Sequence, residues 1–162
     1  MPETADLDLP AFYAAHLSPG MIDLSTSSPH PLALRVLNSD DISGAFLTPQ
    51  TSLPLRLAIA SRYTTLGADD ILLCSGAGEA LAAIAYATLT RGDIVAASPS
   101  TYPSLCNAAR HLGASIVEPA PGTRATLALL TNPDVPFGDI RDTAAFITDA
   151  LSSGALPLVD EV

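Results

Sequence analysis

The sequence contains no lysine: all seven of its basic residues are arginines, in a chain of 162 residues with a net charge of −10. Chemistry that requires an amine side chain is therefore excluded for this chain alone. The P-loop is excluded as well, because its GxxxxGK[ST] motif needs a lysine. A chain this acidic cannot assemble the basic surface that neutralises nucleic-acid phosphates, so we expect no nucleic-acid partner.

Tryptophan is also absent, and only two cysteines are present. Cys74 and Cys106 lie in apolar contexts without metal-ligand spacing, which predicts buried free thiols and no metal site. The longest apolar stretch, residues 80–89, is half the ~20 residues that a membrane span requires. The acidic N-terminus, MPETADLDLP, lacks the basic and apolar regions of a signal peptide. We therefore expect a cytoplasmic protein with no membrane partner.

Apolar segments that alternate with helical patterns are what the chain does have, with 48% hydrophobic residues. The patterns predict strands over residues 70–75, 93–99, 115–119, 125–132 and 156–162. They predict helices over residues 53–66, ended by Gly67, and over residues 78–90, 102–113 and 141–154. Such alternation is typical of an α/β fold, a mostly parallel sheet with helices on both faces in three layers.

Two regions differ in character. Residues 1–50 are irregular and rich in Ser and Pro, and we expect them to be a loosely structured N-terminal segment. Residues 51–162 carry the α/β pattern. The sequence ends within its last apolar segment, which leads us to expect a piece of a longer protein.

The segment CSGAGEAL places small residues between a predicted strand and a predicted helix. Backbone N–H groups in such a loop can bind phosphate. Ser75, Gly76 and Ala77 are the candidate phosphate-binding residues. A dinucleotide-binding GxGxxG motif fits poorly, because its third glycine position is Leu81 and the next strand ends without an acid. A plain tight turn, with Ser75 as a helix cap, remains an alternative.

Three further polar or aromatic residues follow predicted strands. Tyr102 follows the strand at 93–99, Asn132 ends the strand at 125–132, and Asp160 lies near the end of the last one. The carboxyl edge of a parallel sheet is where ligands bind. Pyridoxal 5′-phosphate requires all these groups: a phosphate cradle, a stacking ring, an amide for its phenolic oxygen and a carboxylate for its pyridine nitrogen. Each residue also has an ordinary alternative, as a packing aromatic, a turn residue or a solvated acid.

Residues 53–162 resemble the class I/II aminotransferases, the fold-type I enzymes that use pyridoxal phosphate. SGAGEAL resembles the family's phosphate loop, TYPSL its ring-stacking segment, TNPDVPFG its NPxNPTG turn and LVDEV its pyridinium-binding strand. The resemblance implies that Tyr102 stacks on the ring, Asn132 bonds the phenolic oxygen and Asp160 pairs with the pyridine nitrogen. It implies that residues 1–50 form a substrate-side arm and that residues 51–162 are part of the cofactor-binding large domain.

The family's covalent chemistry departs from this sequence. In the family a lysine downstream of the Asp strand bonds to the cofactor aldehyde, and a small C-terminal domain follows; neither is present here. The resemblance implies amino-group transfer between an amino acid and a 2-oxo acid in a complete, homodimeric enzyme, with this truncated chain inactive alone. The alternatives are a non-catalytic remnant, a partner subunit that lacks the lysine, and an NAD(P)-binding domain. The fold also supports other reactions at the α-carbon.

Overall fold

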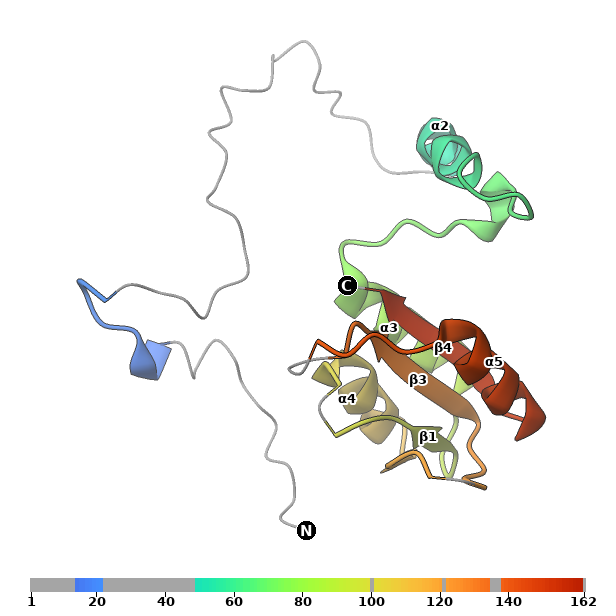
Figure 1. The fold of residues 1–162 in the computed structure, drawn as a ribbon. Helices are drawn as coiled ribbons and strands as arrows, with labels where there is room; N and C mark the ends of the chain where they lie inside the picture. The colour runs from blue at the N-terminus through green and yellow to red at the C-terminus, as the bar shows by residue number, and fades with distance from the viewer. Residues whose placement is uncertain (1–13, 22–48, 100, 121, 135–137, 162) are drawn as a thin grey trace. The chain divides into compact units, whose positions relative to one another are not determined.

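The computed structural model describes residues 14–21, 49–99, 101–120, 122–134 and 138–161 (Figure 1). The chain divides into two units, Asp8–Leu73 and Met1–Leu7 with Cys74–Val162. The predicted division into residues 1–50 and 51–162 stays a prediction, because residues 22–48 lie outside the described part. Residues 14–16 are helical.

Within the first unit, helix α2 (Pro49–Ala60) is followed by a short 3-10 helix, η3 (Ala68–Asp70). The Arg56 guanidinium donates to the Ala68 carbonyl at 2.8 Å and lies 3.4 Å from the Asp69 carboxylate, which ties η3 to α2. The predicted helix was expected to run to Gly67, and that end is wrong. Gly67 instead starts η3, where its N–H donates to the Asp70 carboxylate at 2.8 Å.

The predicted strand at residues 70–75 is also not formed. Ile71 has extended backbone angles, but the segment 71–74 belongs to no strand of the structure. A strand requires a hydrogen-bonded neighbour, and within the described residues this segment has no ladder partner. The apolar pattern thus predicted the extended backbone of Ile71 but not the absence of a paired strand.

The second unit is built on a four-stranded parallel sheet in the order β2-β1-β3-β4. The strands are β1 (Ile94–Ala96), β2 (Ser115–Val117), β3 (Leu127–Asn132) and β4 (Leu156–Glu161). β3 and β4 pair over their full length, from Leu127↔Leu156 to Asn132↔Glu161. β1 and β3 pair only through Val95↔Leu127 and Ala96↔Ala128. The four strands lie within the segments predicted from sequence.

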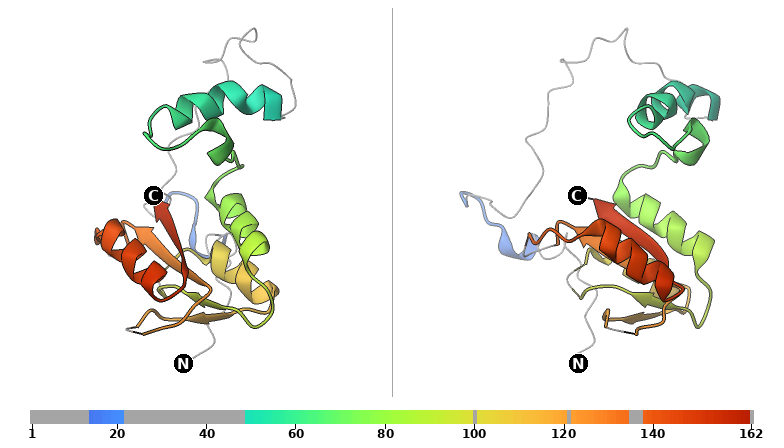
Figure 2. Two further views of the ribbon diagram at one scale, coloured as in Figure 1. Left: turned by 90° about the vertical axis from the view of Figure 1, so that its right-hand side faces the viewer. Right: turned by 45° about the vertical axis from the view of Figure 1, so that its right-hand side comes forward.

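Three helices cover the two faces of this sheet: α3 (Ala77–Thr88), α4 (Pro103–His111) and α5 (Thr143–Ser152). α3 and α4 lie on one face, and α5 lies on the other (Figure 2). All three were predicted: the predictions for α4 and α5 extend one or two residues beyond each end, and that for α3 starts one residue late and ends two residues late. The expected fold class, a parallel α/β/α sheet in three layers, is confirmed.

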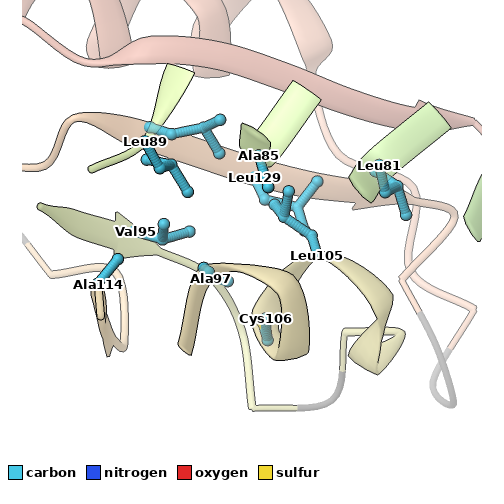
Figure 3. Packing of buried hydrophobic residues seen from close by; sticks show 11 residues of the cluster. Leu81, Ala85, Leu89, Val95, Ala97, Leu105, Cys106, Ala114 and Leu129 are labelled. Carbon is cyan, nitrogen blue, oxygen red and sulfur yellow. The ribbon is translucent and has the colours of Figure 1, made fainter. Parts of the chain in front are cut away.

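Alternation along the strands divides the core between the two faces. Val95 and Leu129 pack against Leu81 and Leu105 of α3 and α4 (Figure 3), and Leu127 belongs to the same cluster. On the other face, small residues of β1 and β3 pack with Ala150 and Phe146 of α5. Strands that are apolar on both faces are typical of buried parallel sheets, and this explains the continuous apolar run of β3.

The amino edge of the sheet is fastened by Asp93. Its carboxylate accepts hydrogen bonds from the Thr90 N–H at 2.7 Å, the Thr126 hydroxyl at 2.8 Å and the Thr90 hydroxyl at 2.9 Å. These donors favour the charged form and hold the pKa of Asp93 below its ordinary value, the Thr90 N–H contributing most. The bond to Thr126 connects the residue before β1 to the residue before β3.

No helix in the described part of the chain is both long and apolar enough to cross a membrane.

Candidate functional site

The N-terminus of α3 carries the three predicted phosphate-binding residues. Ser75, Gly76 and Ala77 are exposed, and Gly76 has φ 99° and ψ 167°, a conformation open almost only to glycine. The first N–H groups of a helix have no intrahelical acceptor, and the helix dipole there favours an anion. α3 precedes β1 and its last residues lead to the start of that strand, so its N-terminus lies at the carboxyl edge of the sheet.

A carboxylate of the chain already binds this loop. The Ser75 N–H donates to Oε2 of Glu79 at 2.5 Å. Glu79 is the third residue after the N-cap Gly76, the capping-box spacing, but it accepts from the residue before the N-cap instead of from the N-cap itself. The loop therefore has an N–H group that holds an acidic group.

Tyr102 lies at the start of α4, as its N-cap residue, with Pro103 at the first helical position. Tyr102 is 52% exposed, so part of it is open to a ligand, and both its stacking role and the alternative of a half-buried packing aromatic stay predictions. A Cβ built on Gly78 of α3 lies 3.4 Å from the Ser104 hydroxyl oxygen of α4. This close approach places the starts of α3 and α4 side by side, with the phosphate loop on one and Tyr102 on the other.

Two threonines join the loop after β1, next to Tyr102 in the sequence, to the end of β3. The Oγ1 atoms of Thr101 and Thr131 are 2.6 Å apart. Thr131 is buried, and a buried hydroxyl without a partner would cost about 1–3 kcal/mol. The chain continues from β1 to β2 on one side of β1, and β3 lies on the other side of β1. The Thr101–Thr131 bond therefore spans the point at which the strand order reverses, where ligands bind in open parallel sheets.

Asp160 is placed by the β3–β4 ladder. It pairs in register with Thr131, and Leu158, two residues before it, packs against the α3–α4 side of the sheet. Since alternate residues share a face, Asp160 lies on this same side, half-buried. Within the described part of the chain, no side chain or backbone group donates a hydrogen bond to its carboxylate.

Asn132 lies on the opposite face, towards α5. Its amide nitrogen donates to the Arg141 carbonyl at 3.2 Å and to the Thr143 hydroxyl at 3.1 Å, and its carbonyl oxygen accepts the Arg141 N–H at 3.1 Å. An amide NH₂ has two donors, and both are used here. The Asp134 carboxylate, 3.6 Å from the Arg141 guanidinium, helps close the same loop. The turn-residue role thus accounts for all the contacts of Asn132, and its contact with a phenolic oxygen stays a prediction.

The structure brings the candidate phosphate loop, Tyr102 and Asp160 to one face of the sheet at its carboxyl edge, and it places Asn132 on the other face. Sequence reasoning missed Glu79, Thr101 and Thr131. The capping-box spacing was a signal for Glu79, whereas the two threonines gave none, because their meeting depends on the strand order. Among the described residues, no group of three or more His, Cys, Asp or Glu side chains is arranged to hold a metal ion.

Solved structures share this fold. The PLP-dependent cyclase OrfR aligns over 93% of this chain and 47% of its own, with a TM-score of 0.75 and 24% identity. An aminotransferase from Mycobacterium tuberculosis aligns over 71% of this chain and 37% of its own (TM-score 0.59, 25% identity). Histidinol-phosphate aminotransferase from Sinorhizobium meliloti, solved with pyridoxal-5′-phosphate, aligns over 71% and 35% (TM-score 0.58, 21% identity). The chain thus spans less than half the length of these proteins.

The profile of one protein family matches residues 31–132, a segment that includes the phosphate loop, Tyr102 and Asn132 and stops before Asp160. No curated protein matches the sequence. The matched family is described as aminotransferase class I and II, and its fold is the one that the solved structures share. The match covers more than half of the chain, which therefore belongs to the class I and II aminotransferase family.

Proposed function

We propose that this chain is the cofactor-binding part of a pyridoxal-phosphate-dependent aminotransferase that moves an amino group between an amino acid and a 2-oxo acid. One observation carries the proposal: an anion-holding loop, an exposed tyrosine ring and an uncommitted carboxylate lie on one face of the ligand-binding edge. The family match supports the cofactor. When bound, pyridoxal phosphate supplies an electron sink for reactions at an amino acid's α-carbon.

The residues present fit the cofactor in three places. Ser75, Gly76 and Ala77 bind the phosphate through backbone N–H groups at the start of α3. Tyr102 orients the pyridine ring by stacking. The half-buried carboxylate of Asp160 holds a proton on the pyridine nitrogen, since an opposite charge nearby favours the protonated form.

Two features do not fit a complete active site. Asn132 uses both amide donors within its own loop, so it reaches the phenolic oxygen only if a bond to Arg141 or Thr143 is released. No lysine exists in the sequence to bond the cofactor aldehyde. This chain therefore binds and orients the cofactor, and the amine that moves protons at the α-carbon comes from elsewhere.

Titration of the purified chain with pyridoxal phosphate tests the proposal. We expect saturable binding, tighter than that of pyridoxal, which lacks the phosphate. Borohydride should fix cofactor only at the α-amino group of Met1, as mapped by peptide mass spectrometry. Asp160→Asn should weaken binding of pyridoxal phosphate. Asp149→Asn, the same change at an exposed position of α5, should not weaken it. Equal affinity for pyridoxal and its phosphate, or no binding, would contradict the proposal.

The absent lysine also supports a second candidate function, a non-catalytic subunit whose partner supplies the amine. The chain with pyridoxal phosphate, an amino acid and a 2-oxo acid should then transfer amino groups no faster than free cofactor. Addition of a lysine-bearing partner chain should raise the rate. A rate that rises with this chain alone would contradict both candidates, since each requires an amine from outside it.

Assembly and location follow the family in this proposal. We place the complete enzyme in the cytoplasm as a homodimer. Cys74 and Cys106 are free thiols, which suits a reducing compartment. NAD(P)H, the ligand of the competing dinucleotide-binding interpretation, should give no thermal shift.

A further inference from the structure

The seam between β1 and β3 is open at its carboxyl end. The ladder between these strands stops at Ala96↔Ala128, whereas β3 continues to Asn132. β1 has already passed into the loop 97–102 that carries Tyr102. Among the described residues, the ladder between β1 and β3 does not continue past Ala96 and Ala128.

The hydroxyl pair closes this opening. The 2.6 Å contact between Thr101 and Thr131 joins residues 30 positions apart, one in the loop and one in the strand. Thr131 is 4% exposed and lies in the part of β3 that pairs with β4, the most extended ladder of the sheet. Thr101 is half-buried, and its N–H closes a turn onto the Ser98 carbonyl at 3.1 Å. The contact thus anchors a surface turn to the rigid centre of the sheet.

Each threonine is next to a residue of the proposed cofactor site. Thr101 precedes Tyr102, and Thr131 is the register partner of Asp160. A path of one covalent link, one hydrogen bond and one ladder pair therefore connects the stacking ring to the carboxylate. Groups that bind one rigid ligand at two points gain affinity when their spacing is fixed beforehand.

We propose that Thr101 and Thr131 are positioning residues that hold Tyr102 at a fixed place relative to Asp160. This inference rests on the proposed function, and it concerns the pyridine ring rather than the phosphate. The phosphate loop lies at the start of α3, on a different element from the turn that Thr101 anchors.

Binding of two probes, pyridoxal phosphate and inorganic phosphate, to the full 162-residue chain tests the inference. Thr131→Val removes the hydroxyl at nearly constant size, and Thr131→Ser retains it. We expect Thr131→Val and Thr101→Val each to weaken pyridoxal phosphate binding about tenfold, the effect of one hydrogen bond. Phosphate affinity should stay within about twofold, and Thr131→Ser should bind like the unaltered chain. Thr148→Val on α5 is the matched control.

The double variant Thr101→Val/Thr131→Val should bind no more weakly than either single variant, because both remove the same contact. Hydrogen exchange without ligand gives a readout independent of the cofactor: the Thr101 amide should exchange faster in both valine variants and normally in Thr131→Ser. If Thr131→Val, which changes a buried residue, fails to fold, Thr101→Val provides the same test at a half-buried position.

Unchanged pyridoxal phosphate affinity in the valine variants would overturn the inference while leaving the proposed function intact. Additive losses of affinity in the double variant would also overturn it. So would equal losses of affinity for pyridoxal phosphate and inorganic phosphate in the valine variants. If the unaltered chain binds inorganic phosphate but not pyridoxal phosphate, the proposed function itself fails, and the positioning role fails with it.

Discussion

Gly78 of α3 and Ser104 of α4 approach so closely that a Cβ on the glycine would lie 3.4 Å from the serine hydroxyl oxygen. The two helices that carry the phosphate loop and Tyr102 thus meet at their first turns. Contact at this point sets the spacing between two parts of the proposed site, and it depends on small residues in the segment SGAGEAL.

The two glycines of this segment should respond differently to alanine. Gly76→Ala places a side chain at φ 99° and ψ 167°, and we expect a loss of about 1–3 kcal/mol in the free energy of unfolding. Gly78 is helical, so Gly78→Ala gains about 1 kcal/mol of helix propensity against a tight but tolerable contact with Ser104. Urea unfolding of both variants measures the difference. Equal destabilisation would argue against the conformation assigned to Gly76.

Glu79 should compete with phosphate for the Ser75 N–H. Replacement by glutamine removes a negative charge, whose repulsion of a bound phosphate about 4 Å away is about 1 kcal/mol in water, so Glu79→Gln should bind inorganic phosphate about fivefold more tightly. Calorimetry at low ionic strength measures this gain. Asp149→Asn, which changes the charge equally on α5, controls for net charge. Unchanged or weaker phosphate binding by Glu79→Gln would show that the two anions do not share a donor.

Asp93 should make stability fall in acid. Its pKa in the folded chain lies below the ordinary value of 3.8, because Thr90 and Thr126 donate hydrogen bonds to the charged form. Its contribution is therefore full above that ordinary value and is lost as the pH falls through the lowered one. Asp93→Asn should lower the urea midpoint at about pH 7, and the difference should shrink towards about pH 3. A difference that grows in acid would reverse the assigned sign.

The two cysteines should differ in reactivity. Burial raises the pKa of the Cys106 thiol, partly offset by Arg110, and so lowers its thiolate fraction. Cys74 is only half-buried, one residue before the phosphate loop. Brief treatment with iodoacetamide should therefore label Cys74 well before Cys106, as peptide mass spectrometry can measure. Labelling of both at one rate would indicate that α4 opens readily.

The sequence predicted the helices and strands better than the contacts that they and the loops make with one another. The apolar run of β3 and the loop after Cys74 could be recognised because both depend on local pattern. Asp160 could be placed at the edge where ligands bind, because the carboxyl ends of parallel strands all lie at that edge. The segment 71–74 was wrongly predicted as a strand, because a strand needs a hydrogen-bonded neighbour from elsewhere in the chain and the local pattern does not show whether one exists. The contacts of Asn132 with Arg141 and Thr143 were missed for the same reason, since they require the closed loop between β3 and α5.

A threonine holds the β1–β3 seam at each end: Thr126, the residue before β3, bonds Asp93 at the amino edge, and Thr131 of β3 bonds Thr101 at the carboxyl edge. Five residues of extended chain separate these threonines by about 17 Å. Substitutions that far apart generally act additively. Substitutions at the amino edge can therefore change the free energy of unfolding without changing ligand affinity. Residues at the carboxyl edge, where ligands bind, can in turn change while the sheet stays the same.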